Sequence, residues 1–380
     1  MGAGRSKEVL PSRVLSLTLI NLTMLWSPEA LLISLVACGF AITSYFVYSS
    51  GQLFVQIPNT PGFTKHAVKA AFEATRLTAS TFLIKEYDDI YSEHPHIYAK
   101  VVPEANTVLL IDSGCGGASN NSDIQITSLR EFIEKVGLSD NEGKPLNEDG
   151  KMKYVVVTTH CHYDHILGIE HFKDSPILAS SHSPAFLKDS QLPENSLCNA
   201  LGIKMPSYTP TLVPHLHVIS SPEDKDALLD VTVLHTPGHT PDELALYDEN
   251  EMMLYVGDSL YEYEPIIFPK EGSIVEWFTS MDYLISFVQR ENRLQHKRGE
   301  SCKREVLINA GHSTAVKPAL NVLLAAKAYM QDVISGEEPV KERMQMRGEE
   351  TVVYGETGDR FSLRCPERLV LEAARRLGLV

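Results

Sequence analysis

The sequence predicts an α/β fold in which a sheet is covered by helices. Three observations support this class: short apolar runs of strand length recur after residue 65, stretches with helical spacing alternate with them, and no internal repeat appears. Of the 380 residues, 43% are hydrophobic and 22% are charged, so the chain can bury a full core. This composition excludes collagen-like, disulfide-scaffold and wholly disordered proteins.

The first 64 residues differ from the rest of the chain. The run Ala30–Tyr48 carries no charge, and a bilayer span needs about 20 apolar residues. We therefore expect residues 1–64 to form a hydrophobic segment that anchors the protein to a membrane in a single pass. The basic residues Arg5, Lys7 and Arg13 favour a cytoplasmic N-terminus. The alternatives are a buried or dimer-forming helix, a wrongly assigned start of the chain, or, without an anchor, a cytoplasmic protein.

The region after residue 65 begins with helix and hairpin patterns. Lys65–Leu77 has the spacing of a helix. His96–Val102 and Thr107–Asp112 are apolar runs separated by Pro-Glu-Ala-Asn, which is typical of a hairpin. Ile124–Val136 again has helical spacing, and the polar residues 138–152 predict a loop.

Strands and helices then alternate to the end of the chain. Tyr154–Thr159 is short and nearly all apolar, as expected for a strand buried on both faces. Further strands are predicted over Pro176–Ser180, His215–Ser220, Leu228–His235, Leu244–Tyr247, Met252–Asp258 and Glu305–Ala310. Helices are predicted over Ser273–Arg290, Lys317–Ile334 and Pro366–Leu377, with a charged loop around one strand at 336–358.

The most informative residues follow the buried strand Tyr154–Thr159, in the order His-Cys-His-Tyr-Asp-His from position 160. Residues two apart on an extended segment point the same way, so His160 and His162 can close on one ion. The chain then turns into a helix near residue 166, which directs Asp164 and His165 to a second position beside the first. Imidazole and carboxylate ligands suit zinc.

Three further candidate ligands stand after predicted strands. They are His239 in HTPGHTPDE, Asp258 in LYVGDS and His312 in LINAGHS. Each follows an apolar run and precedes a turn, where a strand delivers a side chain to the rim of a sheet. Asp258 is the natural bridging ligand, because a carboxylate has two oxygens and can touch two ions.

This combination resembles the metallo-β-lactamase-fold hydrolase superfamily, which includes lactonase and lactamase, glyoxalase II and acyl thioesterase-like branches. The resemblance covers roughly residues 81–334 and implies an αββα sandwich with two Zn²⁺ ions at one sheet edge, although manganese and iron stay open. It also implies the metal ligands and a supporting aspartate: His160, His162 and His239 for the first ion, Asp164, His165 and His312 for the second, Asp258 as the bridge, and Asp112 behind a ligand histidine.

Two positions depart from the pattern of the family. Leu167 stands where a glycine usually follows the metal-binding loop, and Asp258 stands where the best-known zinc β-lactamases have a cysteine. The second departure makes antibiotic resistance a poor prediction. The resemblance divides the chain into the hydrophobic segment 1–64, a catalytic domain at 65–335 and a C-terminal extension at 336–380 that completes the domain.

The chemistry that the resemblance implies is hydrolysis of a small-molecule acyl bond in a lactone, lactam or thioester. Two ions would lower the pKa of a shared water, and Asp164 would accept and return a proton as the leaving group departs. Tyr261 and Tyr263, directly after the bridging aspartate, are candidate substrate-binding residues. The substrate is expected to be uncharged or apolar, because the neighbouring loops are rich in apolar residues.

Two other functions stay open at this point. One is a persulfide-dioxygenase-like enzyme of the same fold with a single iron, and the other is a membrane-tethered, non-enzymatic protein with a vestigial metal site. Nucleic acid is not an expected partner, because a formal net charge of −15 repels phosphate backbones. The sequence gives no prediction of the oligomeric state.

Overall fold

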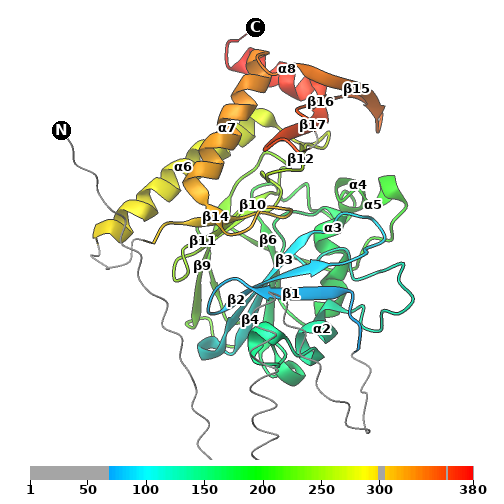
Figure 1. The fold of residues 1–380 in the computed structure, drawn as a ribbon, viewed down its shortest axis with the longest axis vertical. Coiled ribbons are helices and arrows are strands. Elements are labelled where there is room, and N and C mark those ends of the chain that lie inside the picture. The colour runs from blue at the N-terminus through cyan, green and yellow to red at the C-terminus, as the bar shows by residue number, and fades with distance from the viewer. Residues whose placement is uncertain (1–67, 298–303, 357, 380) are drawn as a thin grey trace, which may run out of the picture. The chain divides into compact units, whose positions relative to one another are not determined.

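The computed structural model describes residues 68–297, 304–356 and 358–379, all within the compact unit Ala67–Val380. Two large sheets stack in the middle of this unit, and helices cover their outer faces (Figure 1). A third, smaller sheet lies beside helices α7 and α8 near the C-terminus. The layers agree with the αββα sandwich that the sequence predicts.

The first sheet has seven strands in sequence order. They are β1 (Phe72–Arg76), β2 (Thr81–Glu86), β3 (His96–Val102), β4 (Thr107–Ile111), β5 (Lys153–Val157), β6 (Ile177–Ser180) and β7 (Thr211–Val213). The strands β1 to β4 are antiparallel, whereas β4 to β7 are parallel. Helix α2 (Leu129–Lys135) packs its apolar side on the outer face, and the Ser128 side chain caps it by accepting from the Glu131 N–H.

The second sheet has the strand order β14-β13-β11-β10-β9-β8. Its strands are β8 (Val218–Ser220), β9 (Leu228–His235), β10 (Leu244–Asp248), β11 (Met253–Tyr255), β13 (Leu307–Asn309) and β14 (Lys317–Pro318). Its outer face is covered by α6 (Ile274–Lys297) and α7 (Ala319–Ser335). Its inner face packs on the first sheet through apolar side chains such as Leu109, Val231 and Leu246, which are all fully buried.

The C-terminal region differs from the prediction of a loop with one strand over 336–358. Residues Val340–Met346 (β15) and Glu349–Tyr354 (β16) form an antiparallel hairpin. Arg347 and Gly348 connect them with φ angles of +50° and +80°, which a two-residue hairpin turn requires. Together with β17 (Ser362–Pro366) and β12 (Pro265–Ile267) they make a four-stranded sheet, and α8 (Glu367–Arg376) packs against it.

The predicted helix over Lys65–Leu77 is wrong in its described part. Residues 72–76 form the edge strand β1, which pairs antiparallel with β2 from Phe72 opposite Glu86 to Arg76 opposite Phe82. Helix propensity is a weak prior that tertiary context overrides, and here the pairing with β2 decides. Strand β2 carried no prediction.

The predicted membrane anchor at Ala30–Tyr48, and with it the whole segment 1–64, lies outside the described residues and stays a prediction. Among the described helices, none is both long enough and apolar enough to cross a bilayer.

Candidate metal centre

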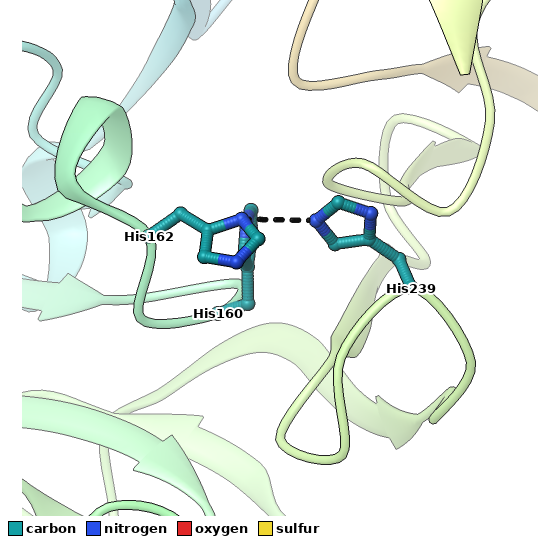
Figure 2. A group of neighbouring side chains, drawn as sticks. All are labelled: His160, His162 and His239. Carbon is teal, nitrogen blue, oxygen red and sulfur yellow. Dashed lines mark hydrogen bonds between the residues drawn. The ribbon is translucent and has the colours of Figure 1, made fainter. Parts of the chain in front are cut away.

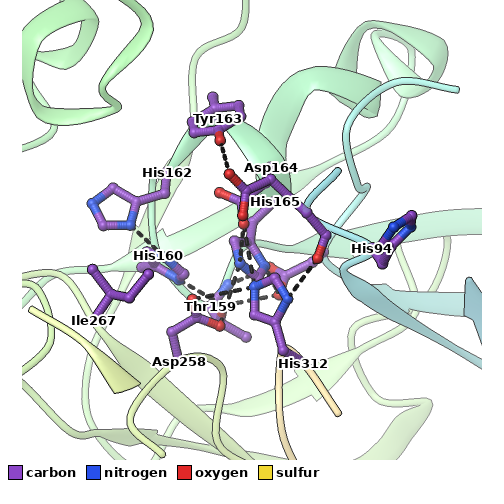
Figure 3. A network of polar contacts seen from close by, with 12 residues as sticks. His94, Thr159, His160, His162, Tyr163, Asp164, His165, Asp258, Ile267 and His312 are labelled. Atoms are coloured by element: carbon purple, nitrogen blue, oxygen red, sulfur yellow. Dashed lines mark hydrogen bonds and ion pairs between the residues drawn. The ribbon is translucent and has the colours of Figure 1, made fainter. Parts of the chain in front are cut away.

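The predicted ligands come together from several elements; Figure 2 labels His239 with His160 and His162, and Figure 3 labels the other four beside them. His160 and His162 follow β5, and Asp164 and His165 belong to the short helix α3 (Tyr163–Ile166). The other three, His239, Asp258 and His312, lie in the segments after β9, β11 and β13. The parallel pairing of β11 with β13 places Asp258 and His312 at the same sheet edge. All seven side chains are buried.

His160, His162 and His239 form a first group, called here the three-histidine group (Figure 2). His162 Nδ1 lies 3.0 Å from His160 Nε2 and 3.1 Å from His239 Nε2. One ring nitrogen of each residue therefore points to a common centre. That is the arrangement of a site in which three imidazoles bind one cation.

Asp164, His165, Asp258 and His312 form a second group, called here the carboxylate–histidine group. Asp164 Oδ2 lies 3.3 Å from Nε2 of both His165 and His312. Asp258 approaches the same two rings, with Oδ1 3.4 Å from His165 Nε2 and Oδ2 3.5 Å from His312 Nε2. Two carboxylates thus alternate with two imidazoles around one centre.

The outer nitrogens of four of these imidazoles are held by oxygen atoms. His160 Nδ1 lies 3.1 Å from Thr159 Oγ1, and His239 Nδ1 lies 2.6 Å from the Ile267 carbonyl oxygen. His165 Nδ1 lies 3.0 Å from Asp112 Oδ2, and His312 Nδ1 lies 3.0 Å from the carbonyl oxygen of Glu93. Such contacts fix the inward nitrogen as a lone-pair donor, as around metal ligands.

Two inward atoms are buried without a hydrogen-bond partner in the described structure, namely His165 Nε2 and Asp258 Oδ1. Orphaned polar atoms of this kind cost free energy unless a further group satisfies them. A divalent cation in the carboxylate–histidine group would satisfy both atoms, and His and Asp are suitable ligands for it. The residues present therefore fit divalent metal binding.

Asp112 connects the two groups through hydrogen bonds, directly to His165 and through Thr159 to His160. Its carboxylate accepts from Thr159 N at 2.7 Å and from Thr159 Oγ1 at 2.9 Å, in addition to its contact with His165. The Thr159 hydroxyl in turn orients His160. Asp112 has a φ of +63°, an uncommon conformation for a residue other than glycine. The predicted supporting role of Asp112 therefore has a counterpart in its contacts with both groups.

The two groups differ in their electrostatics. In the three-histidine group, burial and the neighbouring imidazoles lower the pKa of His160 well below its usual value, and burial lowers the pKa of His162 to about 3. In the carboxylate–histidine group, burial alone would lower the pKa of His312, but Asp258 and Asp164 raise it to about 10. The same pairing with His165 and His312 outweighs burial and holds the pKa of Asp164 well below its ordinary value.

Two acidic residues that carried no prediction also support the centre. Glu243 is fully buried: its Oε1 accepts from the Asp258 N–H at 3.0 Å, and its Oε2 lies 3.6 Å from His160 Nδ1. Glu93 holds His312 through its carbonyl, and its carboxylate accepts from the Tyr163 hydroxyl. Glu243 stands in the HTPGHTPDE segment, but nothing in that segment indicates an inward-facing acid.

A cavity of about 690 Å³ opens over the centre. Five of the candidate ligands form its floor: His162, Asp164, His239, Asp258 and His312. Tyr261, Ile267 and Phe268 contribute an apolar wall. Tyr261 therefore lies where the sequence predicts, and its ring packs 5.3 Å from that of His312. Tyr263 does not: it is 59% exposed and is absent from the cavity wall, because its backbone turns through a φ of +68°.

Comparison with known proteins identifies the superfamily of the chain. A family model described as the metallo-beta-lactamase superfamily matches residues 101–287. The chain belongs to the metallo-β-lactamase superfamily, and its fold and relatives support a hydrolase in general. This confirms the resemblance that the ligand pattern indicated.

The relatives are of two kinds. A protein of Aspergillus versicolor named "Putative transcription factor avaE" is 31% identical over 328 residues, covering 82% of this chain and 92% of its own length. Proteins named acyl-coenzyme A thioesterase MBLAC2 are 24% identical in Gallus gallus and 25% in Homo sapiens. These alignments cover 47% and 44% of this chain, and 60% and 57% of the relatives. A solved metallo-beta-lactamase family protein of Thermus thermophilus is 16% identical with a TM-score of 0.48, covering 71% of this chain and 86% of its own.

Proposed function

We propose that this chain is a metal-dependent hydrolase of acyl bonds and that its substrates are acyl thioesters. The observation that carries the proposal is the convergence of seven buried ligand-type side chains beneath a cavity. Lactones and lactams react by the same chemistry. The thioester is favoured because the MBLAC2 relatives are named as acyl-coenzyme A thioesterases.

In this proposal the three-histidine group holds one Zn²⁺ ion and the carboxylate–histidine group holds a second. Asp258 would hold the second ion, because its two oxygens approach His165 and His312 of that group, and its predicted bridging to the first ion stays part of the proposal. Ions bound there would supply a water of lowered pKa and a Lewis acid for the carbonyl oxygen. The neutral state of His160 and His162 at physiological pH favours binding, since a protonated imidazole has no lone pair to donate.

Two side chains of the cavity would act on the substrate. Asp164 lines the cavity with a carboxylate whose pKa is held low, so it is ionised and can accept a proton from the attacking water through the oxygen that is not directed at His165 and His312. It would return that proton to the leaving thiolate. Burial raises the pKa of Tyr261 well above its usual value, so this hydroxyl keeps its proton and can donate to an oxyanion.

The other candidate functions find less support in the structure. A single-iron dioxygenase needs one ligand group, whereas Asp164, His165 and His312 stand together in a second group. The name of the avaE relative suggests nucleic-acid binding, but the formal net charge of −15 opposes that interaction.

The test is a hydrolysis panel with the full-length, metal-loaded protein. Butyryl thioesters, a γ-lactone and a β-lactam would be compared with and without chelator. We expect thioester turnover that chelator abolishes and that His162→Ala lowers at least a hundredfold, as expected when a metal ligand is lost. His217→Ala, which alters a histidine outside the cavity wall, is the matched control and should retain full activity. Chelator-resistant turnover, or none of any substrate by folded protein, would contradict the proposal.

A further inference from the structure

The four-stranded C-terminal sheet has two different faces. Ile266, Val352, Leu363 and Cys365 lie on one face and are fully buried in the core with α8. The residues that alternate with them line the cavity on the other face, among them Ile267, Thr351, Arg364 and Pro366. One side of this small sheet is thus part of the core, and the other is a wall of the cavity above the candidate metal centre.

Arg364 is a charged residue of this wall and stands on β17, an inner strand of the small sheet. It lies opposite Ile267 of β12, and its backbone carbonyl accepts from the Phe268 N–H at 2.9 Å. The Ile267 carbonyl accepts from His239 Nδ1. The register between two paired strands therefore fixes Arg364 relative to the three-histidine group, so this arginine is held by a rigid part of the site.

The guanidinium of Arg364 is half-buried and has no partner in the described part of the chain. Its Nε is buried without a hydrogen-bond acceptor, and its side chain makes no ion pair. Two other cations near the cavity are paired: Lys270 Nζ lies 2.9 Å from Glu194 Oε1, and Arg368 Nε lies 3.1 Å from Glu349 Oε2. Arg347 also lines the cavity, but it is exposed in the turn between β15 and β16, so its guanidinium keeps its contact with water. Because Glu349 pairs with Arg368, it does not pair with Arg364. The N–H groups of the Arg364 guanidinium therefore remain available as hydrogen-bond donors at the cavity wall.

An unpaired guanidinium in a partly desolvated wall is costly, since its N–H groups have lost water without gaining acceptors. The planar fork of an arginine matches the geometry of a carboxylate or a phosphate, each of which can accept two of its hydrogen bonds. The neighbouring strand β16 adds a hydroxyl to the same wall, because Thr351 lines the cavity and stands opposite Pro366, two residues along β17 from Arg364.

We propose that Arg364 is a specificity-determining residue that binds an anionic group of the substrate, a carboxylate or a phosphate, while the acyl bond lies over the metal centre. The apolar side chains of Ile267, Phe268 and Tyr261 line the same cavity between these two polar regions. The substrate is therefore an acyl thioester with an apolar portion and a remote negative charge. This inference rests on the proposed function and differs from the expectation of an uncharged or apolar substrate.

The experiment compares pairs of thioesters that differ only in the anion. Succinyl and butyryl thioesters of N-acetylcysteamine test a carboxylate on the acyl side. Butyryl-4′-phosphopantetheine and butyryl-pantetheine test a phosphate on the thiol side. For each pair, the ratio of kcat/KM for the charged to the neutral substrate is measured in the full-length protein, in Arg364→Met and in Arg343→Met.

Arg343→Met is the matched control, because Arg343 lies on the same small sheet outside the cavity wall and pairs with Glu367. We expect Arg364→Met to lower the ratio about tenfold to a hundredfold in one of the two pairs, since hydrogen bonds to charged groups are the stronger ones. The pair that responds identifies the source of the anion. Ratios that change less than twofold in both pairs would overturn the inference.

A binding measurement separates this inference from the proposed function. If folded, metal-loaded protein hydrolyses no thioester, the proposed function fails, but calorimetry with inorganic phosphate and with succinate still tests the anion site. We expect Arg364→Met to weaken binding of one of these probes at least tenfold relative to Arg343→Met. Equal affinities in the two variants, or no binding to the unsubstituted protein, would overturn the inference.

Discussion

The three-histidine group and the carboxylate–histidine group orient their imidazoles in the same way but differ in charge. In both, oxygen atoms hold outer imidazole nitrogens and aim the inner nitrogens at a common centre. The first group contains only imidazoles whose pKa values lie below their usual range. The second contains two carboxylates, which raise the pKa values of His165 and His312. When no cation is bound, the imidazoles of His165 and His312 can carry protons that compensate the two carboxylates. The imidazoles of the three-histidine group stay neutral.

The largest expected effect comes from Asp258→Ala, which removes the carboxylate that contacts both histidines of the second group. We expect this variant to lose bound metal and at least about a thousandfold in kcat/KM, because the attacking water is no longer activated. Elemental analysis and the thioester assay measure the two quantities. Asp282→Ala, an exposed aspartate on α6, is the control. Full activity in Asp258→Ala would show that the second group is dispensable.

Glu86 extends the comparison, because it is a buried carboxylate that has no cationic partner among the residues that the structure describes. Burial, opposed by the Gly117 N–H and assisted by Asp89, raises its pKa from 4.5 to about 7. Between these pH values the unfolded chain has released the proton that the folded chain keeps, so stability falls as pH rises and is constant above about 7. Across this pH range the contribution of Glu86 to the free energy of unfolding decreases by about 3 kcal/mol.

We expect Glu86→Gln to remove this fall, which makes the variant the more stable protein at pH 8 but not at pH 4.5. Urea unfolding across this range measures the difference, with the exposed Glu142→Gln as the control. Parallel stability profiles for Glu86→Gln and the unsubstituted protein would mean that Glu86 is already ionised in the folded state.

Asp112→Asn is the substitution that tests how the two groups are linked. Its amide can no longer accept from both Thr159 and His165, so metal affinity should fall about tenfold to a hundredfold. The fall should be greater for the second group, which Asp112 contacts directly, than for the first, which it reaches through Thr159. Competition with a coloured chelator resolves the two affinities, and Asp123→Asn on the surface is the control. Equal losses at both sites would contradict this difference.

Much of this centre could be predicted because ligand chemistry and strand ends are local features of a sequence. The order His160, His162, Asp164, His165 after an apolar run was sufficient to predict two adjacent positions. Glu243 and Arg364 could not be predicted, because their roles depend on pairing between strands distant in sequence. The position of Tyr263 could not be predicted either: it is 59% exposed and outside the described cavity wall, in a local turn that the residue pattern does not show.

The fold shows the same division between local and distant information. The buried strand β5 and the helix α7 were predicted from their apolar patterns, and both are present. The strand β1 was mistaken for a helix, since its pairing with β2 is a tertiary contact. The hairpin of β15 and β16 was predicted as a charged loop around one strand, because β15 is rich in polar residues and largely exposed. Patterns of apolar residues therefore predict buried elements better than exposed ones.

The most direct test of the account is the metal content of the purified, folded protein. Elemental analysis of the full-length protein should find two divalent ions per chain. His239→Ala and His312→Ala, which alter one group each, should retain one ion or less. One iron and no zinc would favour the dioxygenase alternative, and a correctly folded chain that binds no divalent ion would contradict the central claim.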